Sequence, residues 1–144
     1  NETSMLSNHL SSFFGGIAII GWFIGGFSIL VGGIGIANIM FVSVKERTAL
    51  IGIQKSLGAK NYFILLQFII EGIMLAMIGG IAGLLIIFII TLLVGNSLGM
   101  PIVLTLSNVM LGLTISALIG LISGFIPAST ASQLDPVEAI RSTY

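Results

Sequence analysis

Three long apolar stretches, separated by short polar segments, set the pattern of this sequence. They occupy about residues 13–44, 62–94 and 108–126, and each has the length of a helix that crosses a membrane. About 20 apolar residues, at a rise of 1.5 Å per residue, cover the roughly 30 Å of a hydrocarbon core. The pattern therefore predicts an all-α integral membrane fold with three transmembrane helices, at about residues 16–44, 62–94 and 108–126.

The polar start of the chain lacks a helical pattern of apolar residues. We expect residues 1–12 to be irregular and residues 1–15 to be an extracytoplasmic linker from a preceding domain. Because the first residue is Asn1 and no signal-peptide pattern precedes the first apolar stretch, we expect the C-terminal part of a longer polypeptide. His9 is interpreted as a solvated side chain rather than a ligand. Residues 16–144 would then form one membrane domain.

The segment at residues 45–60 has the pattern of a short amphipathic helix. Leu50, Ile53 and Leu57 are spaced so that they share one face. Gly58 is typical of the residue that follows a helix end. Such a helix can rest in the lipid headgroup layer or form a docking surface for a soluble partner, and the pattern leaves both open.

Charge is concentrated in the same segment, which contains four of the five basic residues, namely Lys45, Arg47, Lys55 and Lys60. Basic residues that flank membrane spans favour the cytoplasmic side. Residues 95–106, between the second and third apolar stretches, contain neither Lys nor Arg, which favours the outer side. We therefore expect a multi-pass protein with its N-terminus outside and its C-terminus inside.

Other residue types indicate where the membrane helices begin and end. Asn61 is expected to cap the second span, and Ser107 or Asn108 to cap the third. Pro127 is expected to end the third span, because proline removes a backbone hydrogen bond from a helix.

The polar tail, residues 127–144, contains the signature of a short helix. Asp135 can cap its start, Pro136 fits the first helical position and Glu138 the third. The tail would lie in the cytoplasm beside residues 45–60.

Small residues recur at spacings of three and four in each apolar stretch, which places them along one side of a helix. Such stripes let helices approach closely in lipid, so the first predicts helix packing or a dimer interface. A dinucleotide-binding loop is rejected there because no strand precedes the glycines. The amide of Asn38 is interpreted as a contact between helices rather than with a substrate. The stripes are Gly21, Gly25, Ser28, Gly32 and Gly35 with Asn38; Gly72, Ala76, Gly79 and Gly83; and Gly112, Ser116, Gly120 and Gly124.

Composition narrows the possible functions. The chain is 56% hydrophobic and 7% charged, with zero formal net charge, against about 25% charged residues in soluble domains. It contains no cysteine and one histidine, so we predict no metal site and no binding of nucleic acid. No known catalytic motif occurs, and we predict that the chain is not an enzyme. Glu71 is expected to pair or to reach the interface rather than to transfer protons.

Six motifs follow one another from the first apolar stretch to the tail: GGIGIANIM at 32–40, SVKERT at 43–48, IGIQKSLGA at 51–59, QFIIE at 67–71, PA at 127–128 and LDPVEAIR at 134–141. In this order and spacing they resemble the FtsX-like permease domain of MacB-type, or type VII, ABC transporters. The likeness covers nearly the whole chain after about residue 16. Members of this family have four spans and a large extracytoplasmic domain between the first two, so this chain would hold spans two to four.

The resemblance implies a permease that couples ATP hydrolysis in the cytoplasm to export or efflux across the bacterial inner membrane. ATP and Mg would bind to a separate ABC ATPase subunit or domain, and this chain would need no cofactor of its own. The implied partners are that ATPase, a second permease copy, membrane lipids and a periplasmic adaptor. One alternative is an FtsX-like signalling subunit that regulates an extracytoplasmic cell-wall hydrolase without transport. Another is a purely structural membrane segment.

The resemblance also assigns roles to residues. It implies a coupling helix that contacts the ATPase, with the coupling residues Lys45, Glu46, Arg47, Thr48, Ile51, Gly52, Lys55, Gly58 and Ala59. It implies a motif of the cytoplasmic tail made of Pro127, Asp135, Pro136, Glu138 and Arg141.

Overall fold

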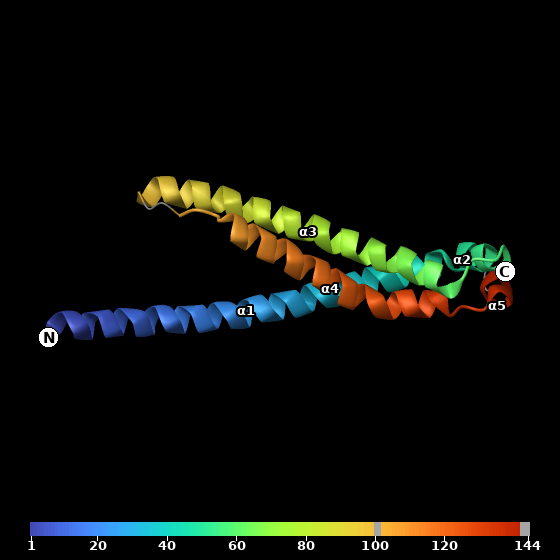
Figure 1. Cartoon of the computed structure of the whole chain (residues 1–144), viewed down its shortest axis with the longest axis horizontal. Helices are drawn as coiled ribbons and strands as arrows, with labels where there is room; N and C mark the ends of the chain where they lie inside the picture. Colours follow the sequence, from blue (N-terminus) through green and yellow to red (C-terminus); the bar gives the residue numbers. More distant parts are fainter. Residues whose placement is uncertain (100–101, 142–144) are drawn as a thin grey trace. The chain divides into compact units, whose positions relative to one another are not determined.

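The computed structural model describes residues 1–99 and 102–141, and this part of the chain is helical and contains no strand. Three of its helices are long and apolar enough to cross a membrane, which confirms the predicted all-α membrane fold. The helices are α1 (Glu2–Glu46), α2 (Thr48–Ser56), α3 (Asn61–Leu98), α4 (Leu106–Ser132) and α5 (Pro136–Arg141) (Figure 1).

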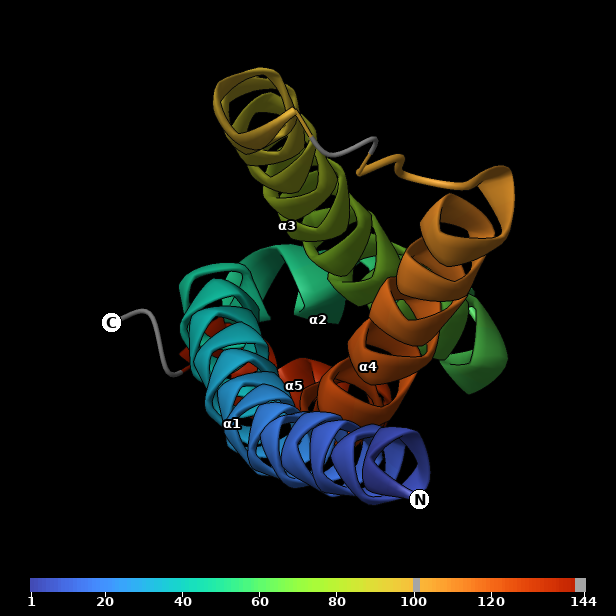
Figure 2. The same cartoon turned by 90° about the vertical axis from the view of Figure 1, so that its left-hand side faces the viewer.

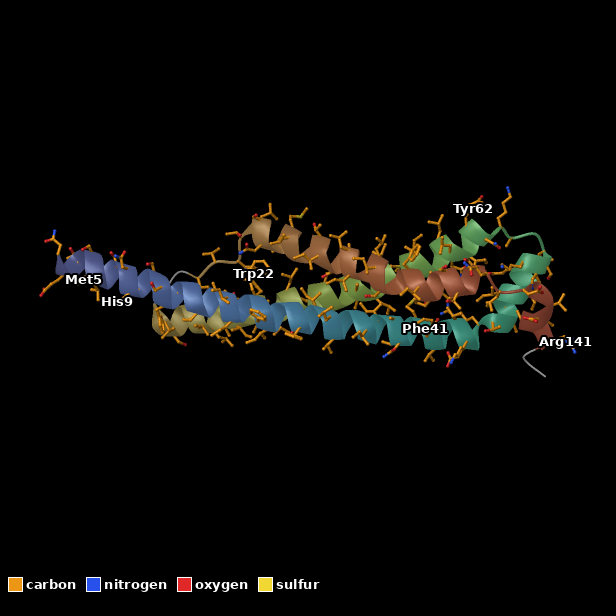
Figure 3. All side chains as sticks on the ribbon, turned by 90° about the horizontal axis from the view of Figure 1, so that it is seen from below. Met5, His9, Trp22, Phe41, Tyr62 and Arg141 are labelled. Atoms are coloured by element: carbon orange, nitrogen blue, oxygen red, sulfur yellow. The ribbon has the colours of Figure 1, made fainter. Side chains whose placement is uncertain are left out.

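The chain divides into two compact units, Asn1–Gly32 and a second unit that begins at Gly33. The first unit is the N-terminal part of α1, a single helix whose large apolar side chains are exposed. Trp22, for example, is 79% exposed, and Figure 3 shows it pointing away from its helix. Exposed apolar side chains all along a helix are stable in lipid and costly in water, as expected for a membrane span.

The prediction that residues 1–12 are irregular is wrong, because α1 already begins at Glu2. The hydroxyl groups of Ser4, Ser7 and Ser11 each donate a hydrogen bond to the carbonyl oxygen three residues earlier, over 2.7–3.0 Å. Extending an existing helix costs much less than starting one, so the long apolar helix that follows can carry a polar segment without its own apolar face. The linker role of residues 1–15 stays a prediction.

In the second unit, α3 and α4 cross at a contact made of glycines. A Cβ atom added to Gly120 would lie 2.7 Å from the carbonyl oxygen of Gly72 and 2.7 Å from the Cα atom of Ile73. A Cβ atom added to Gly72 would lie 3.3 Å from the Cα atom of Gly124. The two backbones can approach this closely because no side chain separates them. In lipid, such close packing replaces the hydrophobic effect as the force that holds helices together.

The stripe of small residues on α3 differs in part from the predicted one. The contact continues from Gly72 and Ala76 to Gly80, where an added Cβ atom would overlap the side chain of Ser116. Gly79 and Gly83, which were predicted to belong to the stripe, would meet no atom within 4 Å. The contact therefore keeps a spacing of four on α3, as α4 does with the predicted residues Gly112, Ser116, Gly120 and Gly124. Spacings of four on both partners are typical of the commonest class of helix packing.

The C-terminal part of α1 joins the same unit. A Cβ atom added to Gly33 would lie 2.8 Å from the Oγ atom of Ser123 on α4. Further along α1, buried side chains from four helices form one cluster. Its aromatic member, Phe68 of α3, is fully buried. The cluster consists of Met40 and Val44 of α1, Ile51 of α2, Ile64 and Phe68 of α3, and Ala128 and Ala131 of α4.

Pro127 does not end the third membrane helix, contrary to the prediction. It lies inside α4, which continues to Ser132, and it is fully buried next to Ala128. Proline removes one hydrogen bond from the helix, but burial of the surrounding residues stabilises the following turn, as is common in membrane helices.

The predicted caps of α3 and α4 are each misplaced by a few residues. Lys60 precedes α3, so that Asn61 is its first residue. Thr105 caps α4 through its hydroxyl oxygen, which accepts a hydrogen bond from the amide of Asn108 at 3.3 Å. Thr105 is a favourable cap residue by type, although Ser107 and Asn108, the predicted caps, rank above it in cap preference.

We predict that Gly120→Leu destabilises the protein, because the added side chain must push the backbone of α3 away. Overpacking of a close contact typically costs about 1–3 kcal/mol. The measurement is the thermal unfolding midpoint of the detergent-solubilised protein. The matched control is Gly79→Leu, which adds the same side chain where an added Cβ atom meets nothing within 4 Å. Equal midpoints for the two variants would contradict the assigned contact.

Candidate functional site

α2 and α5 lie side by side at the end of the second unit where α3 begins and α4 ends (Figure 1). Viewed along the helices, α2 leads from the end of α1 toward the start of α3 (Figure 2). We call residues 45–60 together with residues 133–141 the polar end. It unites the segment that was predicted to be a coupling helix with the predicted tail helix.

At the corner between α1 and α2, residues 44–48, the side chain of one threonine bonds back to the end of α1. The hydroxyl of Thr48 is 2.9 Å from the carbonyl oxygens of both Val44 and Lys45. These are among the last carbonyl groups of α1, which lack partners within a helix that ends. Only Arg47 separates the two helices, with φ −100° and ψ 11°. A threonine hydroxyl that bonds back to such carbonyls is a known cause of helix bends.

Arg47 forms a two-pronged ion pair with Glu71 of α3. Its Nη1 atom lies 3.2 Å from Oε2, and its Nη2 atom lies 3.3 Å from Oε1. The exposed fractions of the side chains are 45% for Arg47 and 29% for Glu71. The expectation that Glu71 pairs is thus confirmed, and the sequence analysis had not found its partner. Exposed ion pairs add about 0–1 kcal/mol to stability, but the two-pronged geometry fixes the direction of both side chains.

Gly52 allows α5 to pack directly on α2. A Cβ atom added to Gly52 would lie 2.9 Å from the Cβ atom of Ala139 and 3.2 Å from the carbonyl oxygen of Pro136. Ala139 and the neighbouring Ile51 of α2 are each 2% exposed. The absence of a side chain at Gly52 is therefore a packing requirement.

Lys55 and Asp135 hold the chain that leads into α5. The Nζ atom of Lys55 donates a hydrogen bond to the carbonyl oxygen of Leu134 at 2.7 Å. The carboxylate of Asp135 accepts a hydrogen bond from the amide of Val137 at 2.8 Å, as predicted for a helix cap. The predicted start of the helix at Pro136 is also confirmed.

Gly58 ends α2 in the predicted way. Its φ of +100° lies in the left-handed region that favours glycine. The amides of Gly58 and Ala59 donate hydrogen bonds to the carbonyl oxygens of Lys55 and Gln54, each at 3.0 Å. These bonds use carbonyl groups that would otherwise lack partners at the helix end.

The predicted apolar face of α2 is exposed. Leu50 is 51%, Ile53 48% and Leu57 83% exposed, while the opposite face of α2 packs on α5. The side chains of Lys45 and Glu46 are exposed next to it. Pro127, assigned to the tail motif by resemblance, lies apart from this surface in the core of α4.

α5 adds acidic and basic groups to the surface of the polar end. Asp135, Glu138 and Arg141 are exposed. Across the described part of the chain, no three histidine or carboxylate groups lie close enough to hold a metal ion.

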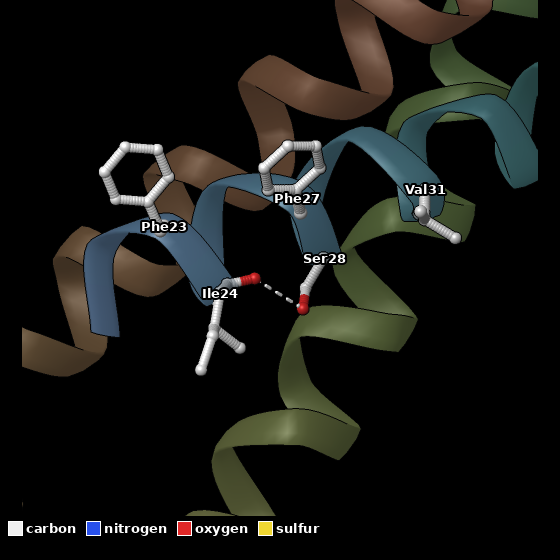
Figure 4. Close-up of a pocket in the computed structure, with 6 residues that line it drawn as sticks. Phe23, Ile24, Phe27, Ser28 and Val31 are labelled. Carbon is white, nitrogen blue, oxygen red and sulfur yellow. Dashed lines mark hydrogen bonds between the residues drawn. The ribbon is translucent and has the colours of Figure 1, made fainter. Parts of the chain in front are cut away.

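The first unit carries a shallow apolar groove on α1. Its volume is about 660 Å³, and Figure 4 shows the phenyl rings that border it. The hydroxyl of Ser28 donates to the carbonyl oxygen of Ile24 at 2.8 Å, so it is satisfied within its own helix. The groove is lined by Phe23, Ile24, Phe27, Ser28, Val31 and Gly32. It includes two positions of the small-residue stripe.

Within its own unit, each glycine of this stripe has open space beside it. Added Cβ atoms at Gly21, Gly25, Gly32 and Gly35 would meet no atom within 4 Å, and Asn38 is exposed.

Three apolar helices and a polar end built from α2 and α5 define a helical membrane protein. The sequence profile of the FtsX-like permease C-terminal family matches residues 22–136, and the chain belongs to this family.

Named relatives are much longer than this chain. It is 38% identical over 141 residues to the macrolide export ATP-binding/permease protein MacB of Rhodopirellula baltica, covering 98% of this chain and 21% of that protein. It is 50% identical over 118 residues to the uncharacterized ABC transporter permease YknZ of Bacillus subtilis, covering 82% and 30%. It is 41% identical over 138 residues to the pyoverdine export ATP-binding/permease protein PvdT of Pseudomonas entomophila, covering 94% and 19%.

We predict that Gly52→Trp separates α5 from α2, because the indole ring needs the space that Ala139 occupies. The amide of Ala139, which is bonded to the carbonyl oxygen of Asp135 at 2.9 Å, should then exchange its hydrogen faster. Hydrogen exchange followed by mass spectrometry measures this. Ser56→Trp adds the same ring at an exposed position of α2 and should leave the exchange of α5 unchanged. Unchanged exchange in Gly52→Trp would contradict the packing described here.

Proposed function

We propose that this chain is the membrane part of an ABC transporter permease of the MacB and lipoprotein-release type, and that its polar end receives the motion of a cytoplasmic ATPase. Membership in the FtsX-like permease family supports this proposal, as do relatives whose names include export and ATP-binding functions. The observation that carries it is an exposed apolar face made of Leu50 and Ile53 of α2 and of Leu57, the residue that follows α2. The opposite face of α2 packs on α5.

A protein partner fits this face better than the lipid headgroup layer. The polar end carries three exposed carboxylate side chains close to α2, those of Glu46, Asp135 and Glu138. The polar end also carries the exposed basic groups of Lys45, Lys60 and Arg141, so its surface is of mixed sign. A protein partner can present a complementary charge to each of these groups, whereas a negatively charged leaflet cannot. Full burial of a Leu or Ile side chain contributes about 1.5–3 kcal/mol. Leu50, Ile53 and Leu57, which are 51%, 48% and 83% exposed, therefore offer enough apolar area for a docking contact.

The proposal places the polar end in the cytoplasm. Lys45, Arg47, Lys55 and Lys60 all belong to it, in agreement with the positive-inside bias. The membrane would be the bacterial inner membrane, and ATP and Mg would bind to the ATPase rather than to this chain. Glu46, Thr48 and Ala59 would lie at the two ends of the contacting helix.

We further propose that two copies of the permease associate through α1. Its stripe of small residues, which includes Gly21, Gly25 and Ser28, is of the kind that is typical of close helix contacts in membranes. Asn38 lies on the same helix and could bond to the second copy. A periplasmic adaptor would then meet the extracytoplasmic side of the dimer. The export names of the relatives favour transport over the signalling alternative.

The docking face is tested by replacing Leu50, Ile53 and Leu57 with Asn together. We expect the permease-dependent ATPase activity to be lost from the purified assembly of the permease with its ATPase, because the ATPase loses its apolar contact. Replacement of the same three residues with Met keeps the face apolar and should keep the activity. Hydrogen exchange of α5 shows whether the Asn variant is still folded. Full ATPase activity in a folded Asn variant would refute the docking face.

The dimer contact is tested with a cysteine at position 28, which is informative because the chain has no other cysteine. We expect Ser28→Cys to form a disulfide between copies in membranes. Adding Gly25→Leu should reduce this cross-linking by separating the helices. Gly26→Leu, one position round the helix, serves as the control and should have less effect. Cross-linking that responds equally to both leucines would argue against this interface.

A further inference from the structure

Arg47 occupies the one position between α1 and α2, and both prongs of its guanidinium are used within the chain. Nη1 and Nη2 each bond to a different oxygen of Glu71, at 3.2 and 3.3 Å. The bond joins residues 24 apart in sequence. It therefore connects the corner at the start of α2 to the third turn of α3.

Backbone hydrogen bonds run into and out of the corner, from the amide of Arg47 to the carbonyl oxygen of Ser43 at 3.1 Å and from the amide of Ile51 to the carbonyl oxygen of Arg47 at 2.9 Å. Arg47 has backbone angles between helix and strand, in a sparsely populated region, and it is not a glycine or a proline. The hydroxyl of Thr48 bonds to the last carbonyl groups of α1 but makes no contact that sets the direction of α2 relative to α3. Ile51 of α2 lies in the same buried cluster as Ile64 and Phe68 of α3. The ion pair between Arg47 and Glu71 adds a polar contact of fixed geometry between the corner and α3.

We propose that the ion pair between Arg47 and Glu71 sets the angle at which α2 leaves the membrane helices, and that Arg47 is a positioning residue rather than a contact for the ATPase. The proposal rests on the proposed function only for its consequence, which is that the docking face of α2 is presented in a fixed direction. The angle itself is a property of this chain alone.

The chemistry of the pair supports an internal role. A guanidinium binds both oxygens of a carboxylate in one plane, so it fixes orientation as well as distance. If the side chain of Arg47 bonded to a partner instead, the carboxylate of Glu71 would be left unpaired. Glu71 is the eleventh residue of α3, a predominantly apolar helix. An unpaired carboxylate is costly near hydrocarbon. Lys45 lies two positions away, is exposed and can meet a partner without this loss.

The angle can be measured with spin labels on introduced cysteines, since the chain has none of its own. Ser56→Cys lies at the end of α2, and Leu66→Cys lies on the exposed side of α3. The distance distribution between the labels is recorded by pulsed electron paramagnetic resonance, in the full-length protein in lipid nanodiscs. We expect a narrow distribution that Arg47→Glu broadens and shifts. Lys45→Glu makes the same change of charge and should leave the distribution unchanged.

The charge swap decides whether the pair itself is responsible. Arg47→Glu combined with Glu71→Arg restores the ion pair in reverse and should restore the narrow distribution. Arg47→Lys keeps the charge but cannot bond in two prongs, so it should give an intermediate width. An unchanged distribution in Arg47→Glu, or a swapped protein as disordered as the single variant, would overturn the proposal.

Transport-linked ATP hydrolysis separates this proposal from the proposed function. We expect Arg47→Glu to lower it about tenfold, a size typical of coupling between sites, and the swap to recover most of it. One outcome is that the label distances respond as expected but the rate of ATP hydrolysis does not depend on the permease. The proposed function is then wrong, and the role of the ion pair is still supported. If Arg47→Glu abolishes ATPase binding with unchanged distances, Arg47 is a partner contact and the proposal is wrong.

Discussion

The close approach of α3 and α4 at Gly72 and Gly120 is the constraint on which the second unit depends. Lipid tails are as apolar as leucine, so helices in a membrane gain little from hiding apolar surface from one another. They associate when their backbones can approach, and a Cβ atom added to Gly120 would lie only 2.7 Å from backbone atoms of Gly72 and Ile73. Larger residues at this crossing would move every element that α3 and α4 carry.

The polar end inherits its arrangement from that crossing. α3 contributes Glu71 from its third turn. Leu134 and α5 follow the end of α4. The two helices together therefore position the groups that bind α2. Arg47 bonds to the first of these groups, Lys55 to the second, and Gly52 packs on α5. α2 is thus held by one ion pair, one hydrogen bond and one packed face. Its remaining face, which is apolar, is free of contacts with α5.

Much of this could be predicted because it depends on local sequence. The lengths of the apolar stretches determined the three long helices. Gly58 ends a helix through its own backbone conformation, and Asp135 starts one through its side chain. The contact residues of α4 were found because they are all small and spaced by four. Polar residues 1–12 and Pro127 were misjudged because a long apolar helix extends past residues that would not begin a helix themselves.

The remaining features depend on which helix faces which, and periodicity does not contain that information. Gly79 and Gly80 are chemically identical, and only the direction of the crossing selects Gly80. The same holds for α1, where Gly33 packs on α4 and Gly35, a residue of the predicted stripe, does not. The partner of Glu71 could not be identified from spacing, since Arg47 is 24 residues away and several basic residues lie at similar distances along the chain.

The two connections of α2 leave it almost no slack. A single residue joins it to α1, and four residues join it to α3, three of which are bonded back to α2 through their amides. Short connections fastened in this way cannot stretch to absorb a displacement. A force applied to α2 must therefore tilt or rotate the adjoining ends of α1 and α3. The mechanical stiffness of these few connecting residues determines how much of a displacement of α2 is transmitted to the two membrane helices.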